Sequence, residues 1–436
     1  MNQTPALISN RLTIFVLGAS GFIGAHLAAA LRQAGHRVVR GVRQAGDAAD
    51  AVSCDFTRDL TPEIWWPRLA GVDVVVNAIG ILRESDGSRF DVIHHRAPLA
   101  VAQACIGSGV RCFVQISALG DPADGEFIAS KHRFDVELSQ TQLDSVILRP
   151  SVVYAWSGSY GGTSLLRALA ATPWALLVPG GGRQRLQPME VEDLGRLVVT
   201  IAESVPASRG MYEVGGPEIL ELRDYLLYWR RWLRIESRRE LHVPLPLVKT
   251  GIWFAERFGK GPMGKTIWQM LVRGNACEVD SLAHLQRDFG FRPRSLEQVL
   301  SEHPSQVQDR WHARLYPLVP ILRVLIAIVW IVSGIVGLFT PSASIESLVA
   351  NSLLGGMHPI ALARASAVLD IVLGTVLLLG WRSRLIVFAM LASLLGYTLV
   401  FGALLPALWL DPLGGLLKNV IVLCALIILF VLLDRR

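Results

Sequence analysis

Residues 12–35 read LTIFVLGASGFIGAHLAAALRQAG, and three successive patterns in this stretch decide the fold. Residues 12–17 are apolar and β-prone, which predicts a buried strand. Residues 25–35 have apolar side chains at helical spacing and end in Gly35, the residue type that commonly stops a helix. Residues 18–24, between them, read GASGFIG. The stretch therefore predicts a strand, a glycine-rich turn and a helix, the first unit of a parallel α/β sheet.

The spacing of the glycines gives each one a role in such a turn. Gly18 permits the tight turn, Gly21 lets the backbone approach a pyrophosphate, and Gly24 lets the helix pack closely on the strand. The unpaired N–H groups at the helix start can bind phosphate oxygens. An ordinary tight turn is the competing interpretation. We expect a dinucleotide site that includes Gly18, Ser20, Gly21, Phe22, Ile23 and Gly24.

The end of a second predicted strand, residues 37–42, bears on the choice of coenzyme. An NAD site usually places a carboxylate there, whereas this chain has Arg43, with Arg40 nearby. A guanidinium suits a 2′-phosphate, so we expect NADP, with NAD as the alternative; a solvated basic strand end is the competing interpretation. Asp55, after a third strand, is placed to reach the adenine. The remaining expected cofactor positions are Phe56, Asn77, Ala78, Gly80 and Lys131.

Several motifs resemble the short-chain dehydrogenase/reductase superfamily in its extended and atypical branches. They are GASGFIG (18–24), CDF (54–56), NAIG (77–80), FVQIS (113–117), ASK (129–131) and LRPSVVY (148–154). The resemblance covers about the first three hundred residues. ISALGD (116–121) and MYEVGGPE (211–218) resemble, more narrowly, the group related to the 39-kilodalton accessory subunit of respiratory complex I. The resemblance implies a Rossmann-type, doubly wound parallel sheet with a small substrate-side region.

The resemblance also implies catalytic positions. In this superfamily a tyrosine transfers the proton, a lysine four residues later lowers its pKa and binds the nicotinamide ribose, and a serine holds the substrate oxygen. Lys131 matches the lysine and Ser117 is the best match to the serine, but the tyrosine position is Phe127. A benzene ring has no exchangeable proton. The usual proton relay therefore cannot run from this position, and whether the chain is an enzyme is left open.

Three explanations of Phe127 remain open at this point. In the first, coenzyme binding persists without chemistry, because Lys131 and the glycine turn need no phenol. In the second, another group supplies the proton, and Tyr154, Tyr160 and His132 are the nearby candidates. In the third, a quinone-like or flavin-like acceptor takes hydride and draws its proton from water.

The substrate side of such a domain follows Tyr154. Residues 157–163 and 179–185 read as loops. Arg183 and Arg185 either meet an anionic substrate or remain exposed loop charges. In QPMEVED at 187–193, we expect Glu192 and Asp193 to cap a helix.

A later region has two competing interpretations. GKGPMGKT at 259–266 matches a phosphate-binding loop, but such a loop needs a buried strand before it, and residues 247–258 have helical spacing. We therefore expect a coincidental match. The same region contains Trp253, and its aromatic and basic residues suit a membrane surface. With five arginines between 230 and 239 it favours anionic lipid over nucleic acid, and a solvated helix face is the alternative.

The 436-residue chain is 52% hydrophobic, and the excess of apolar residues lies after residue 317. Four blocks there have about the length of a membrane-spanning helix: Leu318–Phe339, Pro359–Gly380, Leu385–Leu405 and Leu416–Leu433. We expect a nucleotide-binding domain at 1–310 (core about 10–155, substrate side mainly 155–190 and 205–310), a linker at 311–317 and an all-α four-helix transmembrane bundle at 318–436. The five cysteines are scattered singly, so we expect no disulfide and no metal site.

Positive charges orient the four predicted spans. The basic residues at their ends are Arg310, Arg314, Arg323, Arg382, Arg384, Arg435 and Arg436. The two other loops, 340–358 and 402–415, contain no Lys or Arg. The positive-inside rule then predicts an inner (cytoplasmic) membrane protein with its N-terminal domain and C-terminus in the cytoplasm.

Asp370 falls near the middle of the second block, where an ionised carboxylate is costly unless paired or hydrated. Arg323, Arg364 and Lys418 are candidate partners, and both a buried structural pair and a proton or quinone role remain open. LRVLIAIVWIVSG (322–334), the Asp370 helix and PLGGLLKN (412–419) are similar to the DoxX-like membrane family. Some members of that family are linked to quinone-coupled oxidation.

Together these features predict a membrane-attached NAD(P)-dependent oxidoreductase that passes hydride equivalents to a quinone or another small apolar acceptor. The expected partners are membrane lipid, that acceptor and a redox protein, and no nucleic acid. The alternative is a non-catalytic NAD(P)-binding sensor or assembly module anchored in the membrane.

Overall fold

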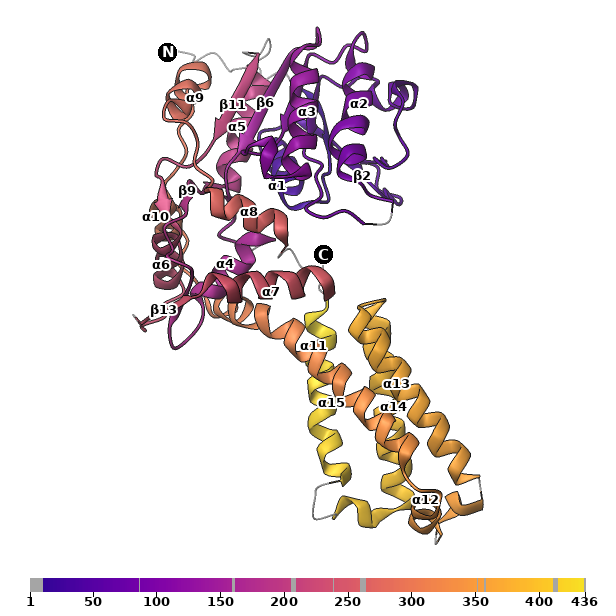
Figure 1. The fold of residues 1–436 in the computed structure, drawn as a ribbon. Helices are drawn as coiled ribbons and strands as arrows, with labels where there is room; N and C mark the ends of the chain where they lie inside the picture. The colour runs from indigo at the N-terminus through magenta and orange to yellow at the C-terminus, as the bar shows by residue number, and fades with distance from the viewer. Residues whose placement is uncertain are drawn as a thin grey trace, which may run out of the picture. The chain divides into compact units, whose positions relative to one another are not determined.

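The structure is a computed structural model, and it describes residues 11–85, 87–158, 161–204, 209–237, 239–258, 264–350, 352–356, 358–410 and 415–434. The chain forms two compact units (Figure 1). Unit 1 comprises Met1–Arg257 and Gly261–Ala313, and unit 2 comprises Phe258–Lys260 and Arg314–Arg436.

Unit 1 is built on a seven-stranded parallel sheet in the order β11-β6-β5-β4-β1-β2-β3. The strands are β1 (Thr13–Leu17), β2 (Arg37–Val42), β3 (Ala51–Ser53), β4 (Val74–Asn77), β5 (Cys112–Ile116), β6 (Ser145–Pro150) and β11 (Gly210–Val214). The strand order reverses between β1 and β4, and ligands of such sheets bind at the carboxyl ends of the strands beside this reversal. The predicted Rossmann-type sheet is confirmed.

Helices cover both faces of this sheet, as the alternation of side chains along β1 shows. Ile14 and Val16 lie in one core with α1 (Phe22–Gln33), α5 (Val191–Glu203) and α9 (Ser281–Phe289). Phe15 and Leu17 lie in a second core with α2 (Ala97–Cys105) and α3 (Glu126–Ser139). A strand buried on both faces needs a continuous apolar run, which residues 12–17 provide.

The substrate side of unit 1 has a third, aromatic-rich core around Tyr154, Tyr225 and Trp229. Its elements are β7 (Val153–Tyr154), α4 (Gly162–Ala170), β8 (Leu176–Pro179), β9 (Arg185–Leu186), β10 (Met189–Glu190), β12 (Leu220–Glu221), α6 (Leu222–Trp232), β13 (Glu240–Val243), α7 (Leu245–Phe258), α8 (Lys265–Arg273) and α10 (Leu296–Glu302). A helix, α7, precedes the GKGPMGKT stretch, so the strand that a phosphate-binding loop requires is not there. Residues 259–263 of that stretch lie outside the described residues.

Within its described residues, unit 2 contains four helices that are long and apolar enough to cross a membrane. They are α11 (Val307–Phe339, which begins in unit 1), α13 (Pro359–Leu379), α14 (Ser383–Leu404) and α15 (Gly415–Leu432). The four predicted apolar blocks coincide with these helices. Helix α11 covers residues 311–317, where the sequence predicts a linker, and the short helix α12 (Ser342–Val349) follows it.

Glycines bring α11 and α13 into close contact. A Cβ atom at Gly334 would lie 2.5 Å from the carbonyl oxygen of Ala367, and one at Gly374 would lie 2.8 Å from that of Ala327. Small residues at such positions let helix backbones approach in a membrane, where dispersion replaces the hydrophobic effect. The α11–α13 pair is therefore intolerant of larger side chains at Gly334 and Gly374.

The polar side chains Arg364 and Asp370 of unit 2 differ in their hydrogen bonding. Arg364, a predicted partner of Asp370, donates instead to the carbonyl oxygens of Gly337 (2.6 Å) and Thr340 (2.7 Å) at the end of α11. It therefore satisfies carbonyl groups that the helix end leaves unpaired. Among the residues described, the Oδ1 atom of Asp370 has no hydrogen-bond partner.

We predict that Gly334→Ala lowers the thermal stability of the full chain in detergent, because its methyl group would overlap the Ala367 carbonyl oxygen. Overpacking of this kind costs about 1–3 kcal/mol. Gly396→Ala is the matched control, since a Cβ atom there meets nothing within 4 Å and alanine favours a helix. Thermal unfolding followed by circular dichroism measures both variants. Equal unfolding temperatures would contradict the close helix contact.

Candidate functional site

The glycine turn between β1 and α1 has the geometry of a phosphate-binding turn. Gly18 has φ +76°, and a Cβ atom there would lie 2.8 Å from Ile79. A Cβ atom at Gly24 would lie 2.2 Å from the Gly18 carbonyl oxygen, so only glycine allows α1 to approach the turn. Helix α1 begins at Phe22, and Gly21 at its N-cap supplies no capping side chain. The start of α1 therefore carries no capping side chain among the described residues, which suits the binding of an anionic oxygen.

The ends of β1, β4 and β5, which carry several of the predicted cofactor residues, lie together beside this turn. Gly18 contacts Ala78 at the end of β4. Asn77 donates to the side chain of Gln115 on β5 at 2.8 Å, which joins the ends of these two strands. Ser20 is exposed at the helix start, Ile23 is half-buried, and the Phe56 side chain packs in the core against Trp65. Phe56 can therefore meet a coenzyme only through its backbone.

The two basic residues at the end of β2 differ in whether their guanidinium groups are already paired. Arg40 forms a bidentate pair with Asp50, with distances of 3.0 Å from Nε and 2.7 Å from Nη2. Arg43 is exposed and forms no hydrogen bond or ion pair with the part of the chain that the structure describes. Hydrogen bonding by Thr57 holds the pKa of Asp55 below its ordinary value, so Asp55 remains an anion near Arg43. Only Arg43 of the two arginines is open to a ligand.

Lys131 is buried beside a glycine at the end of β4. Its Nζ atom donates to the carbonyl oxygen of Ile116 at 3.1 Å, and only 5% of the residue is exposed. A Cβ atom at Gly80 would lie 3.4 Å from this Nζ. Burial lowers the pKa of Lys131 to about 8, against the opposing effect of Asp135. The amine is thus held in a low-dielectric site at the strand ends.

Ser117, the other predicted catalytic residue, already uses its hydroxyl proton in a hydrogen bond. Its Oγ atom donates to Asp135 Oδ2 at 2.7 Å, and Arg149 Nε donates to the same oxygen at 2.9 Å. All three residues are buried or half-buried. This network holds α3 against the end of β5, so Ser117 serves the arrangement of the site in this structure.

Phe127 forms part of an apolar wall next to Lys131. Its ring centroid lies 6.0 Å from that of Phe90 and 5.4 Å from that of His94, and only 7% of Phe127 is exposed. Ala118 and Met270, which comes from α8, complete the wall. The sequence analysis did not identify Phe90, His94 or Met270, because no local pattern links residues so far apart.

His94 is a buried, neutral member of this wall. It lies in a single π-helical turn, Val92–Arg96, and its Nε2 atom accepts from the Ile81 N–H at 3.0 Å. Its Nδ1 atom lies 3.0 Å from Ser130 Oγ. Burial, reinforced by the charge of Lys131, lowers the pKa of His94 well below its ordinary value. An imidazole in this state is no source of an acidic proton at neutral pH.

The alternative proton donors considered from the sequence are poorly placed. Tyr154 is fully buried in the substrate-side core, where burial raises its pKa above the ordinary value. The His132 ring lies 3.0 Å from the Ala118 carbonyl oxygen, and burial lowers the pKa of His132. Tyr160 lies outside the described residues. Neither described candidate supplies the proton that Phe127 lacks.

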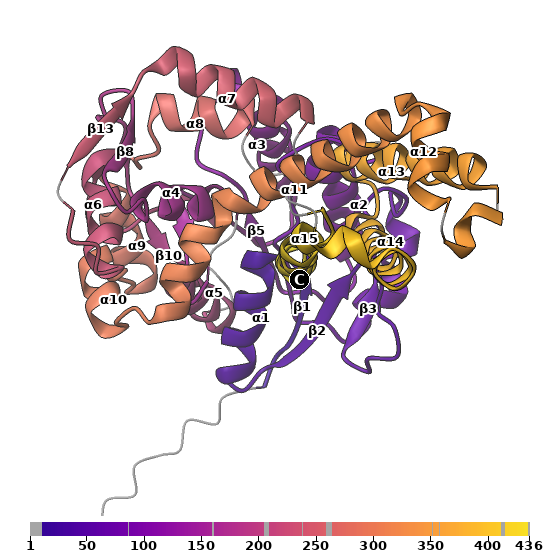
Figure 2. The same ribbon diagram turned by 90° about the horizontal axis from the view of Figure 1, so that it is seen from below.

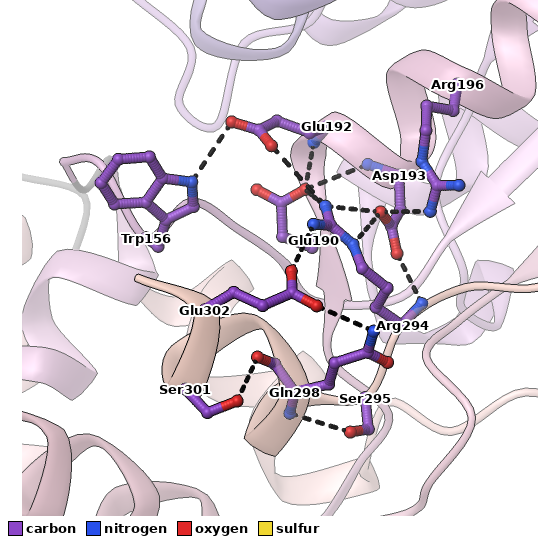
Figure 3. A network of polar contacts seen from close by, with 10 residues as sticks. All are labelled: Trp156, Glu190, Glu192, Asp193, Arg196, Arg294, Ser295, Gln298, Ser301 and Glu302. Atoms are coloured by element: carbon purple, nitrogen blue, oxygen red, sulfur yellow. Dashed lines mark hydrogen bonds and ion pairs between the residues drawn. The ribbon is translucent and has the colours of Figure 1, made fainter. Parts of the chain in front are cut away.

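A polar network joins α5 to the segment before α10 (Figure 3). The helix cap is Glu190, whose Oε2 atom accepts from the N–H groups of Glu192 (2.5 Å) and Asp193 (3.0 Å). The predicted cap residues have other roles: Glu192 accepts from Trp156, and Asp193 pairs with Arg294 at 2.8 Å. This correction reflects three nearby carboxylates whose order alone does not identify the cap. Arg294 pairs with all three carboxylates, at 3.4 Å from Glu190, 3.6 Å from Glu192 and 2.8 Å from Asp193, which favours a structural role for the network, although the Oε1 atom of Glu190 has no hydrogen-bond partner among the described residues.

The seven-stranded parallel sheet and the glycine turn are features of Rossmann-type α/β domains. Residues 14–215 match the NAD dependent epimerase/dehydratase family, and residues 327–427 match the DoxX-like family. The chain therefore carries an epimerase-like domain of the short-chain dehydrogenase type followed by a DoxX-like domain.

Curated relatives resemble parts of the chain. NADH dehydrogenase (ubiquinone) 1 alpha subcomplex subunit 9 of Arabidopsis thaliana is 25% identical over 259 residues, which cover 54% of this chain and 61% of that protein. The Mus musculus protein of the same name is 26% identical, with coverage of 66% and 79%. Ceramide reductase of Caulobacter vibrioides is 26% identical over 206 residues, with coverage of 44% and 62%.

A solved structure shares the fold. UDP-glucuronic acid 4-epimerase from Bacillus cereus, in complex with UDP-glucuronic acid and NAD, superimposes with a TM-score of 0.50 at 16% identity. The match covers 70% of this chain and 100% of that chain. It shows the architecture of unit 1.

We predict that Lys131→Met stabilises the chain at neutral pH. Because burial lowers the pKa of the folded amine to about 8 from 10.5, the penalty for burying its charge is complete below pH 8. It shrinks as pH rises toward 10.5. The gain should be about 1–3 kcal/mol at pH 7 and should decline above pH 8. Thermal unfolding of the full chain in detergent across this pH range measures it.

Lys249→Met is the matched control, because Lys249 is exposed. It should produce no gain that fades with rising pH. The stability difference between Lys131→Met and the native chain could instead stay constant from neutral to alkaline pH. That result would show that the amine carries no burial penalty.

Proposed function

We propose that this chain is a membrane-attached NAD(P)H-dependent reductase that passes hydride to an apolar, lipid- or quinone-like acceptor. The observation that carries the proposal is the position of Lys131. A buried amine whose pKa is lowered by burial at the strand ends is a candidate for a functional group. This one lies beside Gly80, at the carboxyl ends of the strands next to the strand-order reversal, and an apolar wall adjoins it.

The residues present fit a nicotinamide dinucleotide. The close approach of Gly24 to Gly18 and the open start of α1 suit a pyrophosphate. Lys131, next to Gly80, is placed to donate to the nicotinamide ribose. The exposed Arg43 suits a 2′-phosphate, which favours NADP over NAD. When bound, the reduced nicotinamide supplies two electrons and a proton as hydride and is left oxidised.

The side chains around Lys131 bind and orient but do not donate the second proton. Phe127 has no hydroxyl, Ser117 donates to Asp135, and His94 is neutral. We assign the second proton to water, which restricts the reaction to acceptors that tolerate a transient anion. The apolar wall favours a hydrophobic acceptor. Support comes from the Caulobacter relative, which is named as a reductase of ceramide, itself a lipid.

A second candidate function is a non-catalytic coenzyme-binding module. It is favoured by the loss of the phenol at Phe127 and by the committed hydroxyl of Ser117. The Arabidopsis and Mus musculus relatives are named as subunits of a ubiquinone-linked NADH dehydrogenase. In that case the coenzyme would stabilise the fold, and the partner would be a redox or assembly protein.

We further propose that the chain lies in the inner (cytoplasmic) membrane with both termini in the cytoplasm. Within unit 2, Arg384 at the start of α14 pairs with Asp434 after α15 at 2.9 Å. The basic loop between α13 and α14 therefore shares a side of the bundle with the end of α15. This agrees with the positive-inside assignment, to which Arg435 and Arg436, outside the described residues, also contribute.

We predict that Arg43→Ala weakens NADPH binding about tenfold and leaves NADH binding unchanged, because only NADPH carries the 2′-phosphate. Binding to the full chain in detergent, measured by calorimetry, checks this. Arg58→Ala is the matched control, since the Arg58 side chain is 85% exposed and its carboxylate partner is Asp55. An equal loss for both coenzymes, or none for NADPH, would contradict the role assigned to Arg43.

We predict that membranes with the native chain oxidise NADPH in the presence of an apolar acceptor drawn from a panel of quinones and lipid ketones. Lys131→Met should lower kcat/KM about tenfold or more. Phe127→Tyr should change it less than about threefold, because the proton is assigned to water. NADPH consumption measures all three, with Arg37→Ala, an exposed residue at the start of β2, as the control. NADPH binding without consumption by any of them would reject the reductase and favour the binding module.

A further inference from the structure

An exposed apolar surface lies on the substrate side of unit 1, away from the core residues described above. It is formed by Trp174, Leu241, Leu245, Leu247 and Trp253, which are 80%, 56%, 43%, 63% and 57% exposed. We call this set the α7 surface, after the helix that carries three of its members. Single exposed apolar residues are ordinary, but a connected group of this size marks an interaction site.

Backbone contacts connect the members of the α7 surface. Strand β13 pairs with β8 so that Leu241 stands opposite Leu177. Ser237 donates to the Trp174 carbonyl oxygen at 2.5 Å, which holds the segment before β8 beside the segment before β13. A Cβ atom at Gly180 would lie 2.7 Å from Leu245 at the start of α7. The segments that carry Trp174, Leu241 and Leu245 therefore lie next to one another.

Up to Trp253, helix α7 is largely apolar on the side that faces away from the protein, where Thr250 is the polar residue. Its inward side carries the buried Ile252 and the half-buried Val248. Pro246, Thr250 and Trp253 follow one another at helical spacing on the opposite side, with Leu247 beside them. A helix on a water-covered surface normally shows polar residues there. Figures 1 and 2 both show α7 at the edge of unit 1, with α8 beside it.

The charges around this surface are mostly positive, with the exposed Glu236 as an acidic exception between Arg234 and Arg239. Residues 241–253 contain no Asp or Glu. Glu240, directly before them, is paired with Arg223 at 2.7 Å. Four basic residues near the surface are exposed: Arg231, Arg234, Arg239 and Lys249. Tryptophan and leucine bordered by Lys and Arg are the composition of helices that lie in the headgroup region of anionic bilayers.

The same chain guarantees that a bilayer is nearby. Helix α11 starts at Val307 in unit 1, where Ala313 is buried in the core that also holds Trp229. It continues into the first spanning segment. Attachment through one chain gives the bilayer surface a high effective concentration, so that even a weak lipid-binding surface would be occupied. A free protein partner has no such advantage.

We infer that the α7 surface lies in the headgroup region of an anionic bilayer, with Leu247 and Trp253 in contact with lipid. This second contact restrains unit 1 at the membrane in addition to the spanning helices. The inference needs no bound coenzyme and no turnover, so it stands or falls separately from the proposed reductase.

The test places a fluorescent nitrobenzoxadiazole label on Leu247→Cys in the full chain, in nanodiscs of phosphatidylcholine with or without phosphatidylglycerol. Cys424→Ser is the background, because the other four cysteines are buried. We expect quenching by lipid-borne nitroxide to exceed quenching by a water-soluble nitroxide at least about twofold, because interfacial helices sit at the acyl boundary. Phosphatidylglycerol should strengthen the lipid quenching.

Val136→Cys on α3 is the matched control, an exposed valine in a helix outside the α7 surface. It should be quenched mainly from water. If the label at residue 247 behaves like the one at residue 136, the surface faces water and the inference is wrong. If it is shielded from both quenchers, a protein covers it, and the inference is equally wrong. Trp253→Glu should reduce the lipid quenching at residue 247, and an unchanged signal would also count against it.

Discussion

The contact between Gly24 and Gly18 is the constraint on which the arrangement of unit 1 depends. With 2.2 Å between a Cβ atom at Gly24 and the Gly18 carbonyl oxygen, no other residue lets α1 start so close to β1. That approach puts the open end of α1 at the strand-order reversal, beside Ala78. It also leaves the inner side of α1 free to pack on α5 through Leu27 and Leu31. One steric requirement therefore fixes both a phosphate site and one face of the sheet.

The elements that could be predicted from the sequence are those whose cause is local. Strand β2 was predicted with its observed ends because residues 37–42 lie between a helix-ending glycine and a basic turn. The four spanning helices follow from apolar length alone. The contents of the site were less predictable, because they depend on distant pairs. The hydroxyl of Ser117 is committed to Asp135, and Met270 reaches the wall from a helix more than a hundred residues beyond Phe127. Neither relation has a periodic signal in the chain.

Two features of the site oppose each other energetically. Burial disfavours the charge of Lys131. The nearest carboxylate along α3 is that of Asp135, and it is already bound by Ser117 and Arg149. An apolar residue there would satisfy packing better. At the tyrosine position the chain does the opposite, because Phe127 removes a polar group and completes a wall with Phe90. The site thus retains the group that suits a coenzyme and loses the group that would serve a polar substrate.

The two consecutive helices α7 and α8 connect this wall with the proposed lipid contact. Arg273 at the end of α8 pairs with Asp124 at 2.9 Å, just before α3, and Met270 of the same helix packs against the Phe127 wall. The preceding helix presents Leu247 and Trp253 outward. With α7 at the lipid, as proposed, an apolar acceptor dissolved in a bilayer would have α7 beside it and α8, the next helix in the chain, packed against the wall. If α7 instead faced water, such an acceptor would have to leave the lipid and cross an aqueous layer, at about 25 cal/mol for each Å² of apolar surface exposed. An apolar wall and an exposed apolar helix are both unfavourable in a site that is reached only through water. A route from the bilayer past α7 would account for both features, so the two observations support each other.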